Sequence, residues 1–432
     1  MSMKLQYDIQ LPASKSESNR ALLIAAYGGF APDFQNLSDS KDTMVLFKAL
    51  RGLSPMSFQV EHVRLESIGD NPHIIDISDC GTAARFMTTY LATQEGDWLL
   101  TGSQRMLQRP MAPLVEALTS LGADIQYAGK QDFLPLRIRG KSISGGKVTV
   151  VMSQSSQFAS SMLLAAPMWP QGLEMKLFGD LNSFPYLDMT LAMMRHFGAE
   201  VELKDRTITV KPKPYQPNGF VVSTDWSSAS YWYEIAALTE DCEICLRSLR
   251  PQSLNTVEAS KGCPNIQGDS IIAEWMNPLG VMSTEENDAV VLRKKTLEKQ
   301  SFAFDFSYNP DLFPTMVATC AGLQVAARFT GIANLRNKES DRVLAMKMEL
   351  AKTGTVLESI SNNELVVKPS SSLPFYESSA PLQFNAYGDH RIVMALAPLS
   401  LKLGYLTFDH PEVVEKSYPN YWKEVSFLRV LP

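Results

Sequence analysis

The feature that most constrains this 432-residue chain is a repeated pattern in which the end of an amphipathic helix, a glycine and a short strand-like segment follow one another. Glycine suits the left-handed position that closes a helix. The pattern recurs about every 77 residues, longer than the roughly 20–50 residues of solenoid repeats, so each unit should be a small α/β subdomain. The glycines are Gly122, Gly198, Gly280 and Gly354, with Gly52 as a weaker member. The spacing predicts about six units with atypical ends, most simply three in each of two domains.

The length of the chain favours the same division. One hydrophobic core seldom serves more than about 250–300 residues, so two domains are expected. Clustered proline, asparagine and glycine mark residues 211–219 as a loop, and this stretch, with the segment just before Asp225, is the candidate linker. We expect the chain to cross between the domains a second time near residues 11–13.

Composition and charge exclude several classes of protein. Apolar residues make up 45% and charged residues 20% of the chain, as in ordinary globular proteins. The net charge of −6 gives no general attraction to nucleic acid or to an anionic membrane, so neither is an expected partner. The first ten residues do not resemble a secretion signal, and no apolar stretch approaches the ~18–20 residues of a membrane span. We therefore expect a soluble, cytoplasmic protein.

The cysteines and the absent motifs exclude most cofactors. The pair Cys242 and Cys245 has C-x-x-C spacing with Cys263 not far away, but its surroundings are typical of a strand, and no second pair or histidine completes a metal site. We expect structural, reduced cysteines and no metal. No phosphate-binding P-loop, dinucleotide-binding glycine motif or serine-hydrolase elbow is present, so no cofactor is predicted. The five cysteines are Cys80, Cys242, Cys245, Cys263 and Cys320.

Several expected helix starts could hold anions, because free N–H groups and the helix dipole favour negative charge there. Any one of them alone can be an ordinary capped helix. The expected starts are at Ser14, Asp79, Ser153, Ser183, Asp225 and Asn309. What distinguishes them is the density of nearby cations, which suggests a cage for substrates with several negative charges. These cations are Lys15, Arg20, Arg85, Arg105, Arg109, Lys338, Arg342, Arg391 and Lys416.

Two charged segments are open to two interpretations. Residues 337–342 carry four charges before an amphipathic helix and could be a solvated first turn or part of the cage. His390 precedes an apolar run and could be a cap, a core histidine or a functional residue. The residues alone thus indicate an anion-binding α/β protein without naming its reaction.

Taken in order, these loops resemble the 5-enolpyruvylshikimate-3-phosphate synthase family along nearly the whole chain. The matching segments are residues 11–20, 81–85, 105–110, 155–157, 338–342, 389–391 and 416–419. The resemblance implies an α/β (α+β) fold of two domains, each of three βαβαββ subdomains, with the active site in the interdomain cleft. It also implies that residues 1–14 join residues 226–432 in one domain and that residues 15–225 form the other.

The activity implied by this resemblance is transfer of the enolpyruvyl (1-carboxyvinyl) group of phosphoenolpyruvate to the 5-hydroxyl of shikimate 3-phosphate. Phosphate leaves through a tetrahedral intermediate, on the pathway to chorismate and the aromatic amino acids. The family implies a monomeric transferase without a cofactor, whose domains close on the substrates.

The resemblance also assigns residues to the substrates. It implies that shikimate 3-phosphate is bound by Lys15, Ser16, Arg20, Ser155, Ser156, Gln157, Ser183, Asp311, Asn334 and Lys338. It implies that phosphoenolpyruvate is bound by Lys15, Gly81, Arg109, Gln157, Arg342, Arg391 and Lys416. For catalysis it implies that Asp311 takes the hydroxyl proton, Glu339 protonates the methylene, and Lys15 stabilises the leaving phosphate.

Two departures and three alternatives accompany this interpretation. Asp79 and Phe86 stand where the family commonly has Asn and Pro; Asp79 could weaken phosphoenolpyruvate binding or be turned away as a helix cap. A UDP-N-acetylglucosamine enolpyruvyl transferase usually has a cysteine in the loop matching residues 102–110, which this chain lacks. RNA 3′-phosphate cyclases need a histidine nucleophile and nucleotide chemistry. A non-catalytic sugar-phosphate sensor would lose the proton-transfer groups, yet Asp311 and Glu339 are both present.

Overall fold

The glycines of the repeated pattern close helices in the computed structural model, which describes residues 5–31, 33–53, 72–152, 155–250, 266–298, 301–368 and 381–431. The φ angles of Gly122, Gly198, Gly280 and Gly354 are +97°, +88°, +94° and +77°, a conformation that glycine adopts without strain. Each glycine is followed by a strand, so the pattern is confirmed at these positions. The four strands are β5 (Asp124–Tyr127), β9 (Val201–Lys204), β13 (Val281–Glu286) and β17 (Val356–Ser361).

Four sheets share one topology, in which a parallel pair of strands is extended by an antiparallel hairpin. Their orders are β3-β4-β6-β5, β7-β8-β10-β9, β1-β12-β14-β13 and β15-β16-β18-β17. Two further sheets are parallel pairs, β11 with β2 and β19 with β20. A chain of α/β subdomains is therefore confirmed, whereas six complete βαβαββ units stay a prediction, because the described residues show the full order in four sheets.

The chain forms two compact units. One comprises Met1–Ser14, Asp39–Lys41 and Ser223–Pro432, and the other Lys15–Ser38 and Asp42–Val222. Each unit contains three of the six sheets. Among the helices of the described residues, none is long and apolar enough to cross a membrane.

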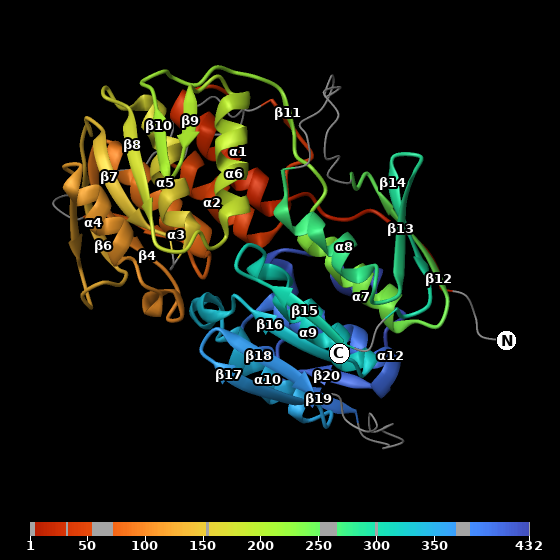
Figure 1. The fold of residues 1–432 in the computed structure, drawn as a ribbon. Coiled ribbons are helices and arrows are strands. Elements are labelled where there is room, and N and C mark those ends of the chain that lie inside the picture. The colour runs from red at the N-terminus through yellow and green to blue at the C-terminus, as the bar shows by residue number, and fades with distance from the viewer. Residues whose placement is uncertain are drawn as a thin grey trace. The chain divides into compact units, whose positions relative to one another are not determined.

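In the unit that contains Lys15, buried helices pack against one another and the strands lie outside them (Figure 1). Its helices are α1 (Lys15–Gly28), α2 (Lys41–Arg51), α3 (Gly81–Thr93), α4 (Ala112–Ser120), α5 (Ser156–Ala165) and α6 (Phe184–His196), with short helices η1 (Met106–Gln108) and η2 (Ala166–Met168). Its other strands are β2 (Phe34–Gln35), β3 (His73–Asp76), β4 (Gly96–Thr101), β6 (Leu136–Gly140), β7 (Gly146–Val151), β8 (Leu173–Phe178), β10 (Thr207–Val210) and β11 (Phe220–Val221).

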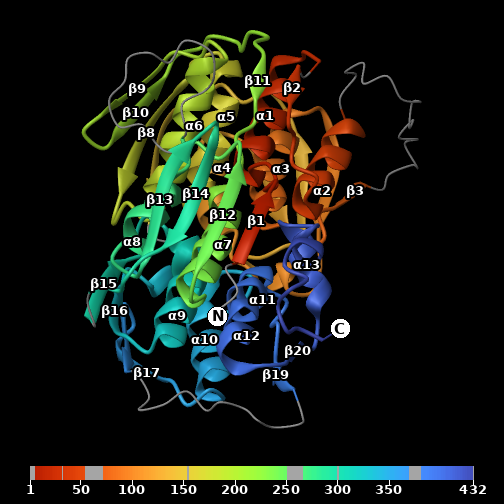
Figure 2. The same cartoon turned by 90° about the vertical axis from the view of Figure 1, so that its right-hand side faces the viewer.

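The second unit follows the same plan, with α7, α9 and α11 packed together at its centre (Figure 2). Its helices are α7 (Trp226–Leu238), α8 (Ile272–Met276), α9 (Phe313–Leu323), α10 (Arg342–Ala351), α11 (His390–Leu396), α12 (Ser400–Leu403) and α13 (Tyr421–Glu424). Short helices are η3 (Gly268–Ile271), η4 (Pro310–Leu312), η5 (Ala333–Asn337), η6 (Ala397–Leu399) and η7 (Pro411–Lys416). Its other strands are β1 (Leu5–Ile9), β12 (Cys242–Arg247), β14 (Ala289–Lys294), β15 (Ser301–Asp305), β16 (Ala326–Thr330), β18 (Glu364–Lys368), β19 (Leu382–Phe384) and β20 (Leu406–Phe408).

The C-x-x-C pair lies in strand β12, as predicted. Cys242 is buried and Cys245 half-buried; both are free thiols, as are Cys80 and Cys320. Cys263 lies outside the described residues, as does Ser153. Within the described ranges, no group of His, Cys, Asp and Glu side chains is placed to hold a metal ion.

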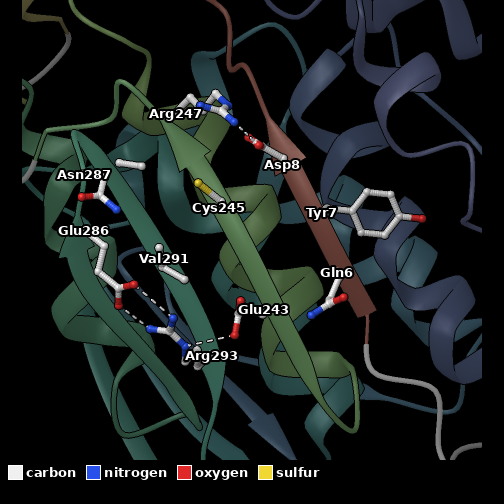
Figure 3. Close-up of a pocket in the computed structure, with 11 residues that line it drawn as sticks. Gln6, Tyr7, Asp8, Glu243, Cys245, Arg247, Glu286, Asn287, Val291 and Arg293 are labelled. Carbon is white, nitrogen blue, oxygen red and sulfur yellow. Dashed lines mark hydrogen bonds and ion pairs between the residues drawn. The ribbon is translucent and has the colours of Figure 1, made fainter.

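The open face of the sheet formed by β1, β12, β14 and β13 has a shallow hollow lined by paired charges (Figure 3). Arg293 bonds Glu243 at 3.4 Å and Glu286 at 2.5 Å, and Arg247 pairs with Asp8 on the neighbouring strand. Such exposed pairs contribute little to stability, about 0–1 kcal/mol each. No predicted site residue lines this hollow.

Glu234 in α7 is a buried carboxyl group whose burial has a consequence for stability. Its exposed fraction is 0%, and no hydrogen-bond donor of the described residues reaches either side-chain oxygen. Burial raises the pKa of Glu234 well above its usual value, since the charged form is desolvated. The folded protein therefore binds this proton more tightly than the unfolded chain does, and the stability it contributes at low pH is lost as pH rises above about 4.3.

We expect Glu234→Gln to raise the stability of the protein relative to wild type by an amount that grows with pH, by up to about 1.4 kcal/mol per pH unit above pH 5. The measurement is the free energy of unfolding in urea at pH 5 and pH 8. Exposed Glu240→Gln, just beyond the same helix, is the control. A stability difference that stays constant with pH would contradict a neutral buried Glu234.

Candidate active site

Helix α10 begins where the sequence predicted a charged helix start, but its first residue is not solvated. Asp341 caps the helix by accepting a hydrogen bond from the Leu344 N–H at 2.9 Å. Arg342 follows as the first helical residue, and its side chain is 1% exposed. The alternative of a solvated first turn is therefore wrong for Arg342.

Three carboxylates surround the Arg342 guanidinium. Nη1 donates to Asp311 at 2.8 Å and Nη2 to Glu339 at 2.9 Å. Nε donates to Asp389 at 2.9 Å. Arginine can satisfy several acceptors in fixed directions because its donors form a rigid planar fork. This one side chain thus joins the loop before α9, the start of α10 and the start of α11.

Asp311 is held by a second guanidinium. Arg391 Nη2 donates to Asp311 Oδ2 at 2.8 Å, so the two carboxylate oxygens face different arginines. Burial acts to raise the pKa of Asp311, but the opposing charges of Arg391, Arg342 and Lys338 outweigh it and hold the pKa well below its usual value. Asp311 is therefore ionised at neutral pH, the state that a general base requires.

Asp389 fixes the start of α11. It is 0% exposed, accepts a hydrogen bond from the Arg391 N–H at 3.1 Å and another from the Ser340 hydroxyl at 3.0 Å. Since Asp389 is the cap, the adjacent His390, 1% exposed, is a buried residue of the first turn rather than a cap.

Three further predicted residues belong to the same unit. Lys338 follows η5, near enough to Asp311 to lower the pKa of that carboxyl group. Lys416 ends η7 and is 3% exposed. Asn334 is 7% exposed, and no donor among the described residues reaches its buried Oδ1 atom.

Asn309 was expected to cap a helix start, and the structure differs from this expectation. Asn309 makes no side-chain cap at η4; its amide donates instead to Asp269 Oδ1 at 3.3 Å. The other oxygen of Asp269 accepts a hydrogen bond from Ser227 at 2.5 Å. Burial and the neighbouring Asp311 charge raise the pKa of Asp269 to about 6.

In the other unit, Lys15 pairs with a residue that the sequence did not single out. Lys15 Nζ lies 3.0 Å from Asp42 Oδ2, and Asp42 in α2 is buried. The Cys80 thiol donates to the backbone oxygen of Asp42 at 3.6 Å and accepts from the Ala83 N–H at 3.3 Å. Helix α3 is thus capped by Cys80, and the expectation that Asp79 could be its cap is wrong.

Two arginine side chains approach the backbone at Gly81. A Cβ atom at Gly81 would lie 2.2 Å from Arg109 Nη1 and 2.8 Å from Arg85 Nη1, closer than atoms can approach. Arg85 Nη1 also donates to the Gly81 carbonyl at 3.0 Å. Gln157 Nε2 donates to Thr82 Oγ1 at 3.1 Å, so α5 and α3 begin side by side. The structure thus brings Gly81, Arg109 and Gln157 together.

Arg20 and the predicted serines lie at three helices: Arg20 and Ser16 in α1, Ser155 and Ser156 at the start of α5, and Ser183 just before α6. Arg20 donates to the Ser16 carbonyl at 2.9 Å, Thr190 Oγ1 at 2.8 Å and the Tyr186 carbonyl at 3.0 Å. Burial lowers the pKa of Arg20 to about 10, so the side chain stays charged at neutral pH. Ser155 caps α5 through the Gln157 N–H at 3.2 Å. Ser183 makes no side-chain cap at α6 and adopts a left-handed backbone, with φ of 58°.

The residues that sequence reasoning missed are mostly acidic partners of the predicted cations. Asp42 resembles any acidic residue in a first helical turn, so nothing local distinguishes it. Asp389 was part of a recognised segment but was not assigned a role. Its position before Arg391 at an expected helix start was the available signal.

Comparison with known proteins identifies the family. Residues 1–425 match the family model described as EPSP synthase (3-phosphoshikimate 1-carboxyvinyltransferase). A 3-phosphoshikimate 1-carboxyvinyltransferase of Bacteroides fragilis is 38% identical over 98% of this chain and 95% of its own length. The chain belongs to this family.

Other relatives agree with this membership, and the expected resemblance is confirmed. The Aliivibrio fischeri member is 31% identical over 98% of this chain and 97% of its own length. The solved structure of EPSP synthase from Acinetobacter baumannii superposes with a TM-score of 0.70 at 20% identity, covering 99% of this chain and 97% of that one, which shows a shared fold. As an EPSP synthase family member the chain is a transferase.

Proposed function

We propose that this chain transfers the enolpyruvyl group of phosphoenolpyruvate to the 5-hydroxyl of shikimate 3-phosphate and releases phosphate. The observation that carries the proposal is Asp311, an ionised carboxylate held between Arg342 and Arg391, with Glu339 bonded to the same Arg342. A base, an acid and two guanidinium groups thus lie within one hydrogen-bonded cluster, which suits an addition between two anionic substrates.

In the proposed addition step, Asp311 accepts the proton of the 5-hydroxyl of shikimate 3-phosphate. The hydroxyl oxygen then bonds to the central carbon of phosphoenolpyruvate. Glu339 delivers a proton to the methylene carbon, which becomes a methyl group. In the elimination step, the carbon–oxygen bond to phosphate breaks and the methyl group returns a proton to the Glu339 carboxylate, which restores the double bond. The proton held by Asp311 leaves with the phosphate, so both carboxyl groups regain their starting states. Lys15 stabilises the charge on the departing phosphate.

Glu339 must carry a proton for the addition, although Arg342 holds its carboxylate at 2.9 Å. We propose that the carboxylate of phosphoenolpyruvate takes the place of Glu339 on this guanidinium. A second anion beside Glu339 then favours its protonated form, because like charges repel.

The predicted binding residues are assigned to the two substrates, with Lys15 and Gln157 common to both. We propose that phosphoenolpyruvate is bound by Lys15, Gly81, Arg109, Gln157, Arg342, Arg391 and Lys416. We propose that shikimate 3-phosphate is bound by Lys15, Ser16, Arg20, Ser155, Ser156, Gln157, Ser183, Asp311, Asn334 and Lys338. Burial of Arg109, Arg342, Arg391 and Lys416 supports this division, since desolvated cations bind phosphate and carboxylate more strongly than exposed ones. We propose that one chain supplies every residue, without a cofactor or a second subunit.

The first experiment measures phosphate release by the purified protein with phosphoenolpyruvate and either shikimate 3-phosphate or UDP-N-acetylglucosamine. We expect release with the shikimate ester alone. Release with the UDP-sugar would identify the other enolpyruvyl transferase. Calorimetric binding of the ester without turnover would favour a non-catalytic sensor.

The catalytic roles predict that Asp311→Asn and Glu339→Gln each lower kcat by about 10²–10⁴-fold, the range of general acid–base catalysis. Shikimate 3-phosphate should still bind Glu339→Gln with a near-normal Kd in calorimetry. Exposed Glu358→Gln, in β17, is the matched control and should keep full activity. Near-normal turnover in both site variants would overturn the assignment.

The contact between Gly81 and Arg109 predicts a selective binding defect. A Cβ atom at Gly81 displaces the Arg109 guanidinium, so Gly81→Ala should raise the KM for phosphoenolpyruvate about tenfold, a loss of about 1.4 kcal/mol. The KM for shikimate 3-phosphate should change less than about twofold. Gly52→Ala is the control, because its Cβ atom would meet only ordinary contacts at 3.7 Å. An equal rise of both KM values would show that Gly81 does not act through Arg109.

A further inference from the structure

Glu349 is a fully buried carboxylate outside the cluster of proposed catalytic residues. It lies in α10, is 0% exposed, and each of its oxygens accepts two hydrogen bonds. Oε1 accepts from the Tyr387 hydroxyl at 2.7 Å and from Asn385 Nδ2 at 3.2 Å. Oε2 accepts from the Asn385 backbone N–H at 2.9 Å and from Lys352 Nζ at 2.5 Å. A buried carboxylate is tolerated only with this degree of pairing.

The segment that Glu349 contacts is a tight turn in an unfavourable backbone conformation. The Asp389 N–H donates to the Ala386 carbonyl at 3.0 Å, which closes a turn over Tyr387 and Gly388. Both central residues have positive φ, 55° and 64°. Glycine adopts this conformation freely, whereas tyrosine pays about 1–2 kcal/mol for it. The turn is therefore stable only while its surroundings hold Tyr387 in place.

Helix α10 contacts this turn at both of its ends. Arg342, the first residue of the helix, bonds Asp389 at the end of the turn, and Glu349 bonds Asn385 and Tyr387 before and within it. Residues seven apart lie on one face of a helix, so a single face of α10 presents both side chains. Lys352 adds a bond to the carbonyl of Gln383 at 3.0 Å.

The turn leads directly into the proposed site. Asp389 caps α11 and bonds Arg342, and Arg391, two residues later, bonds Asp311. A change in the path of the turn would therefore move Asp389 and Arg391 together. Glu349 itself contacts neither Arg391 nor Asp311 by any hydrogen bond that the described residues make.

We propose that Glu349 is a positioning residue: by holding the turn of residues 386–389 in its left-handed conformation, it places Arg391 and Asp389 for phosphoenolpyruvate binding. The kinetic part of this proposal rests on the proposed function, whereas the structural part does not. Glutamine at this position keeps the volume of the side chain but replaces one acceptor oxygen by an amide donor. An amide donor cannot accept the hydrogen bonds that Asn385 and Lys352 donate. The turn then loses hydrogen bonds that one oxygen of Glu349 accepts, and no cavity forms.

The test compares Glu349→Gln, Tyr387→Phe and wild type by steady-state kinetics and by amide hydrogen exchange. We expect Glu349→Gln to raise the KM for phosphoenolpyruvate about tenfold and the KM for shikimate 3-phosphate less than about twofold. Tyr387→Phe removes one hydrogen bond and should give a smaller rise in the same KM. The effect of the double variant should be smaller than the sum of the two single effects, because Glu349 and Tyr387 are in contact. Glu358→Gln, exposed in β17, is the control for loss of a negative charge in this unit.

Amide exchange separates the two parts of the proposal. In Glu349→Gln, exchange of residues 385–391 should accelerate about tenfold or more, while residues 156–165 in the other unit keep their wild-type rates. Unchanged exchange, or a lower Tm with both KM values unaltered, would overturn the positioning role. If the wild-type protein turns over no substrate, the proposed function fails, and faster exchange of residues 385–391 still tests whether Glu349 holds the turn.

Discussion

The buried guanidinium of Arg342 holds together the carboxylates of the proposed catalytic cluster, in the unit that contains residues 223–432. A charge at 1% exposure would be prohibitively unfavourable without acceptors, and here Asp311, Glu339 and Asp389 all supply them. Because these acceptors come from different loops, the path of each loop is coupled to the others through one planar group. A change at one member of the cluster is therefore felt by the others, because all of them bond the same guanidinium.

In the unit that contains Lys15, fewer charged groups hold the helix starts in place. Lys15 meets the buried carboxylate of Asp42, and the Cys80 thiol joins the backbone of that residue to the start of α3. Gly81 follows at once, and its missing side chain admits Arg109. In both units the proposed substrate-binding groups gather at helix starts capped by short side chains. Free N–H groups and helix dipoles there favour the same anions that these side chains are proposed to bind.

The sequence predicted features that depend on neighbouring residues and missed contacts between residues far apart in the chain. Glycine spacing located four helix ends and the strands after them, because a left-handed residue after a helix has few alternatives to glycine. Pairs such as Arg391 with Asp311, 80 residues apart, and Arg342 with Asp389, 47 residues apart, have no local pattern. The cations were predicted from their positions near expected helix starts, but their partners were not. Capping by Cys80 in place of Asp79 was missed for a similar reason: a thiol is a weak acceptor, and only the contact with Asp42 explains its position.

The exposure of the charged residues around Arg342 separates the fixed members of the cluster from those that can exchange partners. Asp389 is 0% exposed and is also bonded to Ser340, so releasing it would leave a charge in the core. Asp311 and Glu339 have side chains 19% and 18% exposed, and each can be reached by a ligand without moving the backbone. An incoming anion can therefore replace a carboxylate on Arg342 while Asp389 keeps the guanidinium oriented. With this asymmetry, the proposed proton donor Glu339 can change its charge state while Asp389 keeps Arg342 oriented.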